Sequence, residues 1–112
     1  MTGAVLPPSG NLVVRASDWK AGAAPGEQVR VLVDDPSGYR TLLMRYEPGP
    51  LGTPHAHDQI EQIYVLEGDF FDDDGSYGPG DFILRLPGTM HRAGSHGGGT
   101  MMLVYSPAVL AA

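Results

Sequence analysis

Glycine and proline are so frequent in this 112-residue chain that no long helix fits between them. They occupy 26 positions, 16 as glycine and 10 as proline. No stretch of ten residues free of them repeats its apolar residues with a clean helical period. A helical bundle is therefore excluded, and so are parallel α/β folds, which need crossover helices between their strands. Short strands joined by glycine and proline turns remain, so the sequence predicts an all-β protein.

Strand-like runs alternate with clusters of turn residues along most of the chain. Residues 1–10 are typical of a loose arm, and the predicted strands cover residues 11–16, 29–33, 39–46, 62–70, 82–86 and 100–105. Strands that recur at this spacing predict a sandwich or a barrel. A mass of 11.9 kDa is enough for one hydrophobic core, so we expect a single domain over residues 1–112.

Charge and cysteine content exclude several classes of function. The formal net charge is −6 and the seven lysines and arginines are scattered singly, which argues against nucleic acid or an anionic membrane as a partner. No apolar run approaches the roughly 20 residues of a membrane span. The chain has no cysteine, so disulfides and thiolate metal sites are absent. Because the N-terminus also lacks the pattern of a secretory signal, we expect a cytoplasmic protein.

Two of the predicted strands are apolar on both faces. Residues 63–66 and 101–105 contain almost no polar side chain, whereas an antiparallel strand with one solvated face alternates apolar and polar residues. One face belongs in the core, and something must cover the other. Either the N-terminal arm covers it or a second subunit does. We favour the second explanation, which predicts a homodimer built on an outer sheet face.

Three of the four histidines form a pattern with metal-ligand spacing. His55 and His57 are two residues apart and Glu61 follows four residues later, so in an extended segment all three project from one face. Alternate residues of a strand lie about 6.6 Å apart, which lets two imidazoles converge on one ion. His91 is the third candidate. Histidines with a carboxylate suit Fe, Mn, Ni, Cu or Zn, and the sequence does not select among them.

These residues stand in two longer patterns that resemble the cupin superfamily. The segment 49–68 resembles the first cupin motif and follows the spacing Gly49-x5-His55-x-His57-x3-Glu61-x6-Gly68. The segment 80–95 resembles the second motif and follows the spacing Gly80-x5-Leu86-x-Gly88-x2-His91-x3-Ser95. It departs from that motif twice. Leu86 occupies the usual proline position, with Pro87 next to it, and Ser95 replaces the usual asparagine.

The resemblance implies a cupin jelly-roll barrel of two antiparallel sheets with one divalent transition metal ion between them. It implies that the ion is held by His55, His57, Glu61 and His91, provided that the turn at Pro87 still positions His91. The position of Glu61 between Ile60 and Ile63 on a predicted strand agrees with this, because a carboxylate buried there would be costly unless a cation neutralised it. The wider pattern is similar to the ChrR-type anti-sigma factor cupin domain and to acetylacetone and dihydroxyacetophenone dioxygenases.

Three functions follow from this resemblance, and each needs a small-molecule substrate or ligand. The first is a metal-dependent dioxygenase acting on a small metal-chelating carbonyl or phenolic compound, in which Glu61 also serves as the catalytic base. The second is a non-catalytic zinc sensor, which the absence of cysteine disfavours. The third is a cupin isomerase or cyclase. Apolar cavity walls, expected at Ile63, Val65 and either Leu84 or Met90, favour a small hydrophobic chelator and hence the enzyme.

Other motifs have simpler explanations. The run 96–99 (His-Gly-Gly-Gly) resembles an oxyanion-hole loop, but the chain lacks the nucleophile elbow that accompanies it, so we interpret the run as a hairpin turn. The run 72–75 (Asp-Asp-Asp-Gly) lacks the alternate acidic spacing of a calcium loop and is interpreted as a solvated turn. Arg45 and Tyr46 are weaker candidates for substrate contacts.

Overall fold

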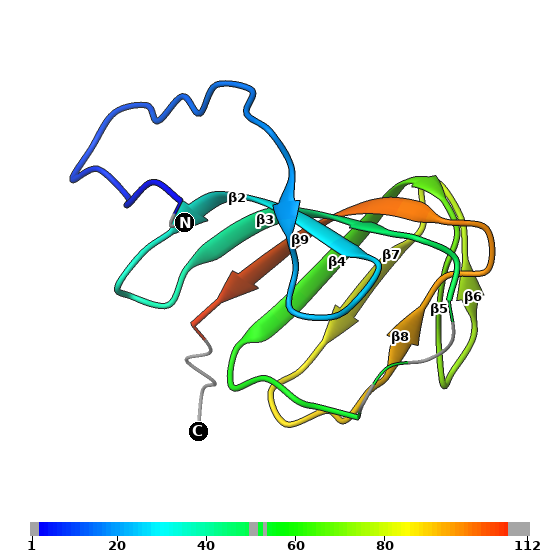
Figure 1. The fold of residues 1–112 in the computed structure, drawn as a ribbon. Helices are drawn as coiled ribbons and strands as arrows, with labels where there is room; N and C mark the ends of the chain where they lie inside the picture. Colours follow the sequence, from blue (N-terminus) through cyan, green and yellow to red (C-terminus); the bar gives the residue numbers. More distant parts are fainter. Residues whose placement is uncertain (1–2, 50–51, 53, 108–112) are drawn as a thin grey trace.

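The structure is a computed structural model that describes residues 3–49, 52 and 54–107 (Figure 1). No described residue is helical, so no helix in this part of the chain is long and apolar enough to cross a membrane. The strands are β1 (Lys20–Ala21), β2 (Glu27–Asp34), β3 (Arg40–Tyr46), β4 (Ile60–Gly68), β5 (Phe70–Asp72), β6 (Ser76–Tyr77), β7 (Phe82–Arg85), β8 (Ala93–Gly94) and β9 (Gly99–Ser106). The prediction of an all-β protein is confirmed.

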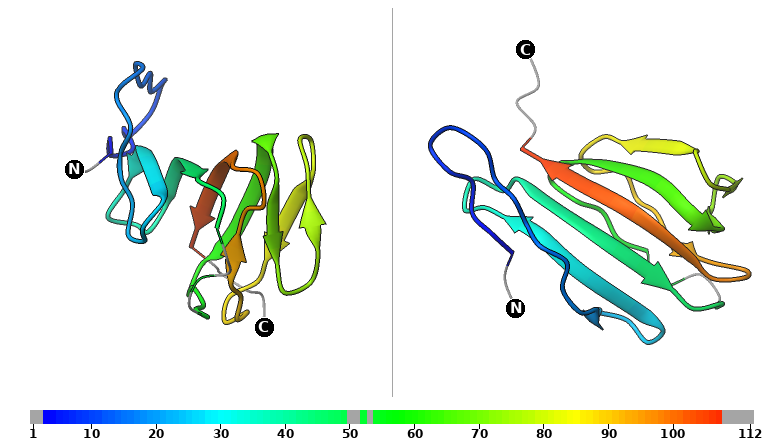
Figure 2. Two further views of the ribbon diagram at one scale, coloured as in Figure 1. Left: turned by 45° about the vertical axis from the view of Figure 1, so that its right-hand side comes forward. Right: turned by 90° about the horizontal axis from the view of Figure 1, so that it is seen from above.

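The strands form two antiparallel sheets that face each other. The larger sheet has the order β1-β2-β3-β9-β4-β7, and the smaller has the order β6-β5-β8 (Figures 1 and 2). β9 is the last strand of the chain, yet it lies between β3 and β4 and pairs with both. This central position explains the burial of its inward residues Met101, Leu103 and Tyr105, and it leaves the apolar residues of its other face unexplained.

The core lies on the inner face of the large sheet. In β4 and β9 every second residue points inward, and the inward side chains of Ile63, Val65, Met101 and Leu103 are almost completely buried. Phe70 of the small sheet closes the core from the opposite side and is 1% exposed. These core residues lie in the strands that lead away from the loops that carry the histidines.

The outer face of the large sheet remains open to solvent. Tyr64, Phe82, Leu84 and Met102 lie on it and are 37–55% exposed. The N-terminal arm does not cover them, because its large apolar residues Val5 and Leu6 are exposed and it extends as a loop beyond the opposite edge of the sheet (Figure 2). The first explanation for the doubly apolar strands is therefore wrong, and the subunit interface stays a prediction.

Two predicted strands differ from the structure. Residues 11–16 form no strand, because the free edge of β2 is already paired with Lys20–Ala21 at one end and with Ala4 at the other. Within the predicted arm, residues 1–2 lie outside the described residues, and the backbone of Ala4 is hydrogen-bonded to Leu32 and Asp34. The single strand predicted at 62–70 is divided between β4 and β5, because the chain leaves β4 at Gly68 (φ 69°) and enters the small sheet after Asp69.

Candidate metal centre

A backbone bridge brings two histidines, one from each motif, side by side. His55 and His91 exchange hydrogen bonds, from the His55 amide to the His91 carbonyl (3.0 Å) and in the reverse direction (2.9 Å). β4 begins only at Ile60, so the expected extended segment from His55 to Glu61 is wrong for its first half, which is a loop. Pairing across two loops, and not alternation along one strand, therefore aligns these side chains.

The turn around Pro87 places His91 beside the other two histidines. The Thr89 amide bonds to the Leu86 carbonyl (3.2 Å), and the amide of Gly88, at φ 82°, bonds to the His57 carbonyl (2.9 Å). Glycine suits this left-handed position. The turn is thus hydrogen-bonded directly to the first motif. One ring nitrogen from each of His55, His57 and His91 lies within 4.8 Å of the others, which is close enough to hold a metal ion.

The surroundings of two of the three histidines favour the neutral form of the ring. Burial lowers the pKa of His57, and burial followed by the charge of Arg85 lowers the pKa of His91. Nδ1 of His91 lies 3.2 Å from the Thr89 carbonyl, which can only accept a hydrogen bond, so Nδ1 carries the proton and Nε2 keeps its lone pair. Nε2 of His57 is buried and has no hydrogen-bond partner among the described residues.

Glu61 lies directly beside the histidines. Its side chain is 3% exposed, and Oε2 and Oε1 lie 3.4 Å from His57 Nε2 and 3.7 Å from His91 Nε2. Arg85 Nη1 donates to Oε1 (2.8 Å) and the Tyr105 hydroxyl donates to Oε2 (2.6 Å). A carboxylate can accept about four hydrogen bonds or metal bonds in all, so each oxygen retains a lone pair.

Sequence analysis did not identify Arg85 as part of the site. It is buried, and its guanidinium bridges Glu61 and Asp72, with Nη2 donating to Asp72 Oδ2 at 2.6 Å. Asp72 was expected in a solvated turn, and that is wrong, because Asp72 is buried while the next two acids are exposed. Burial opposes its ionisation, but hydrogen bonds from the Asp74 backbone and from Arg85 hold the pKa of Asp72 below its usual range. One signal in the sequence could have revealed it: Arg85 comes two residues after Ile83, so on a strand both side chains face inward.

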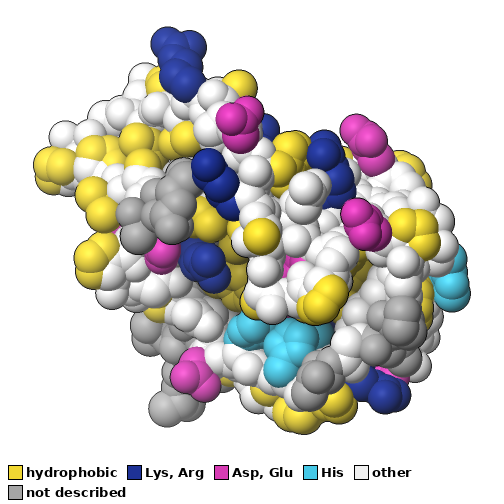
Figure 3. Space-filling model, in the orientation of Figure 1, with side chains coloured by type: hydrophobic (Ala, Val, Ile, Leu, Met, Phe, Trp, Pro, Cys, Tyr) yellow, Lys and Arg dark blue, Asp and Glu magenta, His cyan; other side chains and the backbone are white. Residues whose placement is uncertain are grey.

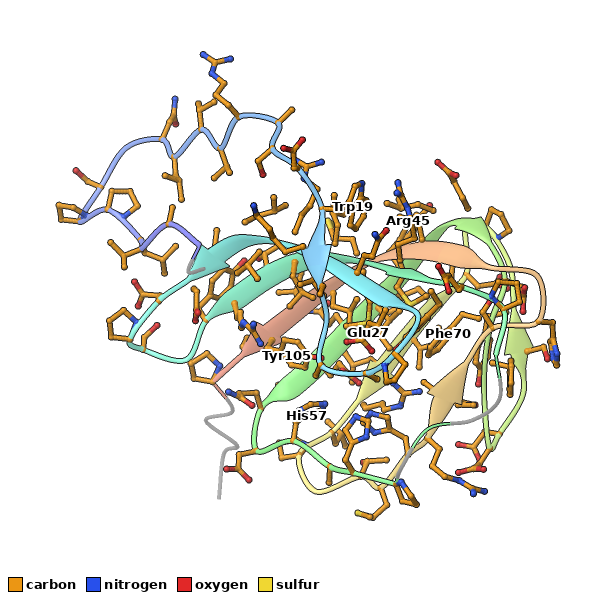
Figure 4. The ribbon with its side chains drawn as sticks, in the orientation of Figure 1. Trp19, Glu27, Arg45, His57, Phe70 and Tyr105 are labelled. Carbon is orange, nitrogen blue, oxygen red and sulfur yellow. The ribbon has the colours of Figure 1, made fainter. Side chains whose placement is uncertain are left out.

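Two tyrosines border the site. Tyr105 lies beside His57, with ring centroids 4.9 Å apart (Figure 4). Tyr46 stacks on Phe70. Burial, followed by the nearby carboxylates, raises the pKa of both phenols. Both therefore stay protonated at neutral pH, and the Tyr105 hydroxyl is a permanent hydrogen-bond donor to Glu61.

The site opens into a cavity of about 1130 Å³ between the two sheets. Figure 3 shows the histidines together at its mouth. Of the expected walls, Ile63 lines the cavity and Val65 lies in the core, whereas Leu84 and Met90 border a separate hollow of about 280 Å³.

The two candidates for substrate contacts face in different directions. Tyr46 lines the cavity. Arg45 does not, since its guanidinium lies 4.0 Å from the centre of the Trp19 ring on the outer face of the sheet (Figure 4).

Comparisons with known proteins identify the fold. The family described as the ChrR cupin-like domain matches residues 11–109. An acetylacetone dioxygenase from Acinetobacter johnsonii has a similar structure (13% identity, 94% of this chain and 80% of that chain, TM-score 0.78). The polyketide cyclase RemF from Streptomyces resistomycificus has a similar structure as well (20% identity, 90% of this chain and 88% of that chain covered, TM-score 0.70). A chain in the complex of SigE with the anti-sigma ChrR from Rhodobacter sphaeroides is also similar (19% identity, TM-score 0.69). The match covers 80% of this chain and 49% of that chain. No curated protein matches the sequence.

Proposed function

The chain belongs to the ChrR cupin-like domain family, and from that premise we propose that it is a metal-dependent cupin enzyme. The proposed reaction is a dioxygenation of a small metal-chelating carbonyl or phenolic compound. The observation that carries the proposal is the buried Nε2 of His57, which lacks a hydrogen-bond partner and faces a carboxylate without bonding to it. A buried polar atom without a partner is costly, and a metal ion would satisfy it.

We assign the ion to His55, His57 and His91, with Glu61 as the fourth ligand. Metal bonds of about 2.1 Å at angles between 90° and 109° separate neighbouring ligand atoms by about 3.0–3.4 Å. The distances from the Glu61 oxygens to the two Nε2 atoms, 3.4 and 3.7 Å, are close to this spacing. Four protein ligands leave open positions on an octahedral ion for a chelating substrate.

The residues around the ion have distinct tasks. A divalent transition metal held here would polarise a chelating carbonyl and, if redox-active, would exchange electrons with dioxygen. Glu61 is the base, since its carboxylate lies beside His57 and His91, and its Oε2 takes the proton of a chelating hydroxyl or enol. Arg85 stabilises the ionised carboxylate, and Tyr105 fixes its orientation.

Two alternative functions use the same ligands. A zinc-binding regulatory domain is favoured by the family match and by the likeness to an anti-sigma complex. A cyclase or isomerase, in which the metal polarises a carbonyl without dioxygen, is favoured by the likeness to a polyketide cyclase. The apolar lining of the cavity by Leu42, Met44 and Leu103 supports the enzyme, because a small organic molecule fits such a space.

Metal analysis combined with oxygen uptake distinguishes these functions. Protein purified without added metal is analysed for its ions, and oxygen consumption is followed on a panel of β-diketones and hydroxylated aryl ketones. Iron or copper with oxygen consumption supports the dioxygenase, whereas stoichiometric zinc without turnover supports the regulatory domain. Glu61→Gln should retain part of the metal and lose most of the turnover, while Glu67→Gln, exposed on the same strand, serves as the matched control.

Assembly and location complete the proposal. We propose a homodimer that covers the exposed side chains of Tyr64, Phe82, Leu84 and Met102, and a mass near 24 kDa in sedimentation would support it. The cysteine-free composition is compatible with a cytoplasmic location, which cell fractionation tests.

A further inference from the structure

Four inward-facing polar side chains form a row across the large sheet next to the histidines. Arg40 of β3 is paired with Tyr105 of β9, Tyr105 with Glu61 of β4, and Glu61 with Arg85 of β7. Neighbouring strands lie about 4.8 Å apart, so the Cα atoms of Arg40 and Glu61 are about 10 Å apart. The side chain of Arg40 lines the cavity from this position. Most other inward positions on the same strand, beginning with Leu42, are apolar.

The two arginines at the ends of the row differ in their partners. Arg85 is 7% exposed and makes two short ion pairs, so it has little capacity for a ligand. Arg40 is 44% exposed, and its one ion pair with a described residue joins Nε to Asp34 Oδ1 at 4.0 Å. That distance is the longest of the ion pairs between described residues, and it leaves the planar fork of Nη atoms available for a carboxylate.

We propose that Arg40 binds a carboxylate of the substrate while the neighbouring oxygen of that substrate reaches the metal. The inference rests on the proposed function and specifies its substrate class, which is a small organic acid whose carboxylate adjoins the chelating carbonyl or phenol. The row supplies the spacing, because Arg40 is paired with Tyr105 and both side chains line the cavity together with the histidines. Arginine suits this task better than lysine, since it donates two parallel hydrogen bonds to a carboxylate.

The other charges of the cavity restrict where an anion can lie. Glu27 and Glu47 line it near the loop that follows β1, and Glu61 lies beside the histidines. Glu61 is compensated by Arg85, but the structure provides no comparable cation for the far end of the cavity among its described lining residues. An anionic substrate is therefore directed to the end that holds Arg40 and the metal site, and away from the two other glutamates.

Binding of salicylate and salicylamide tests the proposal. Both carry a phenol oxygen that can bind the metal, and next to it salicylate has a carboxylate whereas salicylamide has a neutral amide. Fluorescence titration of the zinc-loaded protein should show that Arg40→Gln weakens salicylate binding about tenfold, the lower end for a charge-assisted hydrogen bond, because solvent partly screens this side chain. Salicylamide affinity should change less than twofold. Arg45→Gln removes the same charge from the outer face of the same strand and should change neither.

The outcomes separate this inference from the proposed function. Failure to bind zinc contradicts the metal site, and the same titration of metal-free protein then compares wild type with Arg40→Gln directly. A salicylate affinity that is equal in these two proteins, with or without zinc, overturns the assignment of Arg40. An equal loss with Arg45→Gln also overturns it, because the effect would then reflect net charge alone. Arg40→Lys, which retains the charge and loses the fork, should give an intermediate affinity.

Discussion

Replacement of Arg85 by methionine should destabilise the protein more than any other single loss of charge. Methionine preserves most of the aliphatic stem and removes the guanidinium. Two buried carboxylates, those of Glu61 and Asp72, then lose the cation that lies 2.8 and 2.6 Å from them. Removal of one partner of a buried ion pair is costly because the other charge stays in a medium of low polarity.

The expected loss in free energy of unfolding is about 3–5 kcal/mol. A domain of this size has a total stability of roughly 5–15 kcal/mol, so the variant should be only marginally folded at neutral pH. The midpoint of thermal unfolding should fall by roughly 12–20 °C. Arg92 forms an ion pair of similar length with Asp73 (2.7 Å), but both side chains are over 40% exposed, so Arg92→Met should change stability very little.

The pH dependence provides a second test of the same explanation. In the wild type the pKa of Asp72 is held below its usual range, so its contribution to stability is present above about pH 4 and is lost as the pH falls through the lowered pKa. In Arg85→Met the buried carboxylates lack a cation, so protonation relieves them instead. The difference in stability between the two proteins should therefore shrink between pH 7 and pH 4 in urea unfolding followed by circular dichroism. An equal difference at both pH values would refute the ion-pair explanation.

Three further predictions follow from the structure. Metal affinity should persist below pH 6.5, because the lowered pKa values of His57 and His91 keep the imidazoles neutral there; a competition titration in which affinity is already lost above pH 6.5 would contradict this. Gly68→Ala should cost roughly 2–4 kcal/mol in urea unfolding, since its Cβ would overlap the Gly98 carbonyl at a positive φ, whereas Gly78→Ala, in open space, should be neutral. Phe82→Lys should convert the proposed dimer to a monomer in sedimentation, and a wild type that sediments as a monomer would rule out the interface.

Local patterns were sufficient to predict most of the large sheet. The predicted runs 29–33, 39–46, 82–86 and 100–105 agree with β2, β3, β7 and β9 to within two residues at each end. These strands are rich in β-branched and apolar residues and are bounded by glycine and proline turns, so their propensity and burial act in the same direction. The strand predicted at 11–16 is absent, and local patterns could not reveal this, because pairing depends on which edge of the sheet is still free.

The sequence was sufficient to predict the histidines of the candidate site but not the residues that support them. Motif spacing identified His55, His57 and His91, and the structure brings them together. The bridge between the two loops could not be predicted, since it joins residues that are distant along the chain. The same reason concealed the pairing of Arg85 with Asp72, which comes from the other sheet. Charged side chains on turns are usually solvated, so local composition alone gave the wrong environment for Asp72.

Metal stoichiometry of matched histidine variants tests the central claim most directly. Equilibrium dialysis of the purified chain against micromolar zinc, with elemental analysis of the protein, should give one ion per chain for the wild type. The His55→Ala/His57→Ala/His91→Ala variant should retain none, while His96→Ala, whose ring stacks on Phe71 away from the site, should retain one. A triple variant that is folded and still holds one ion per chain would contradict the account.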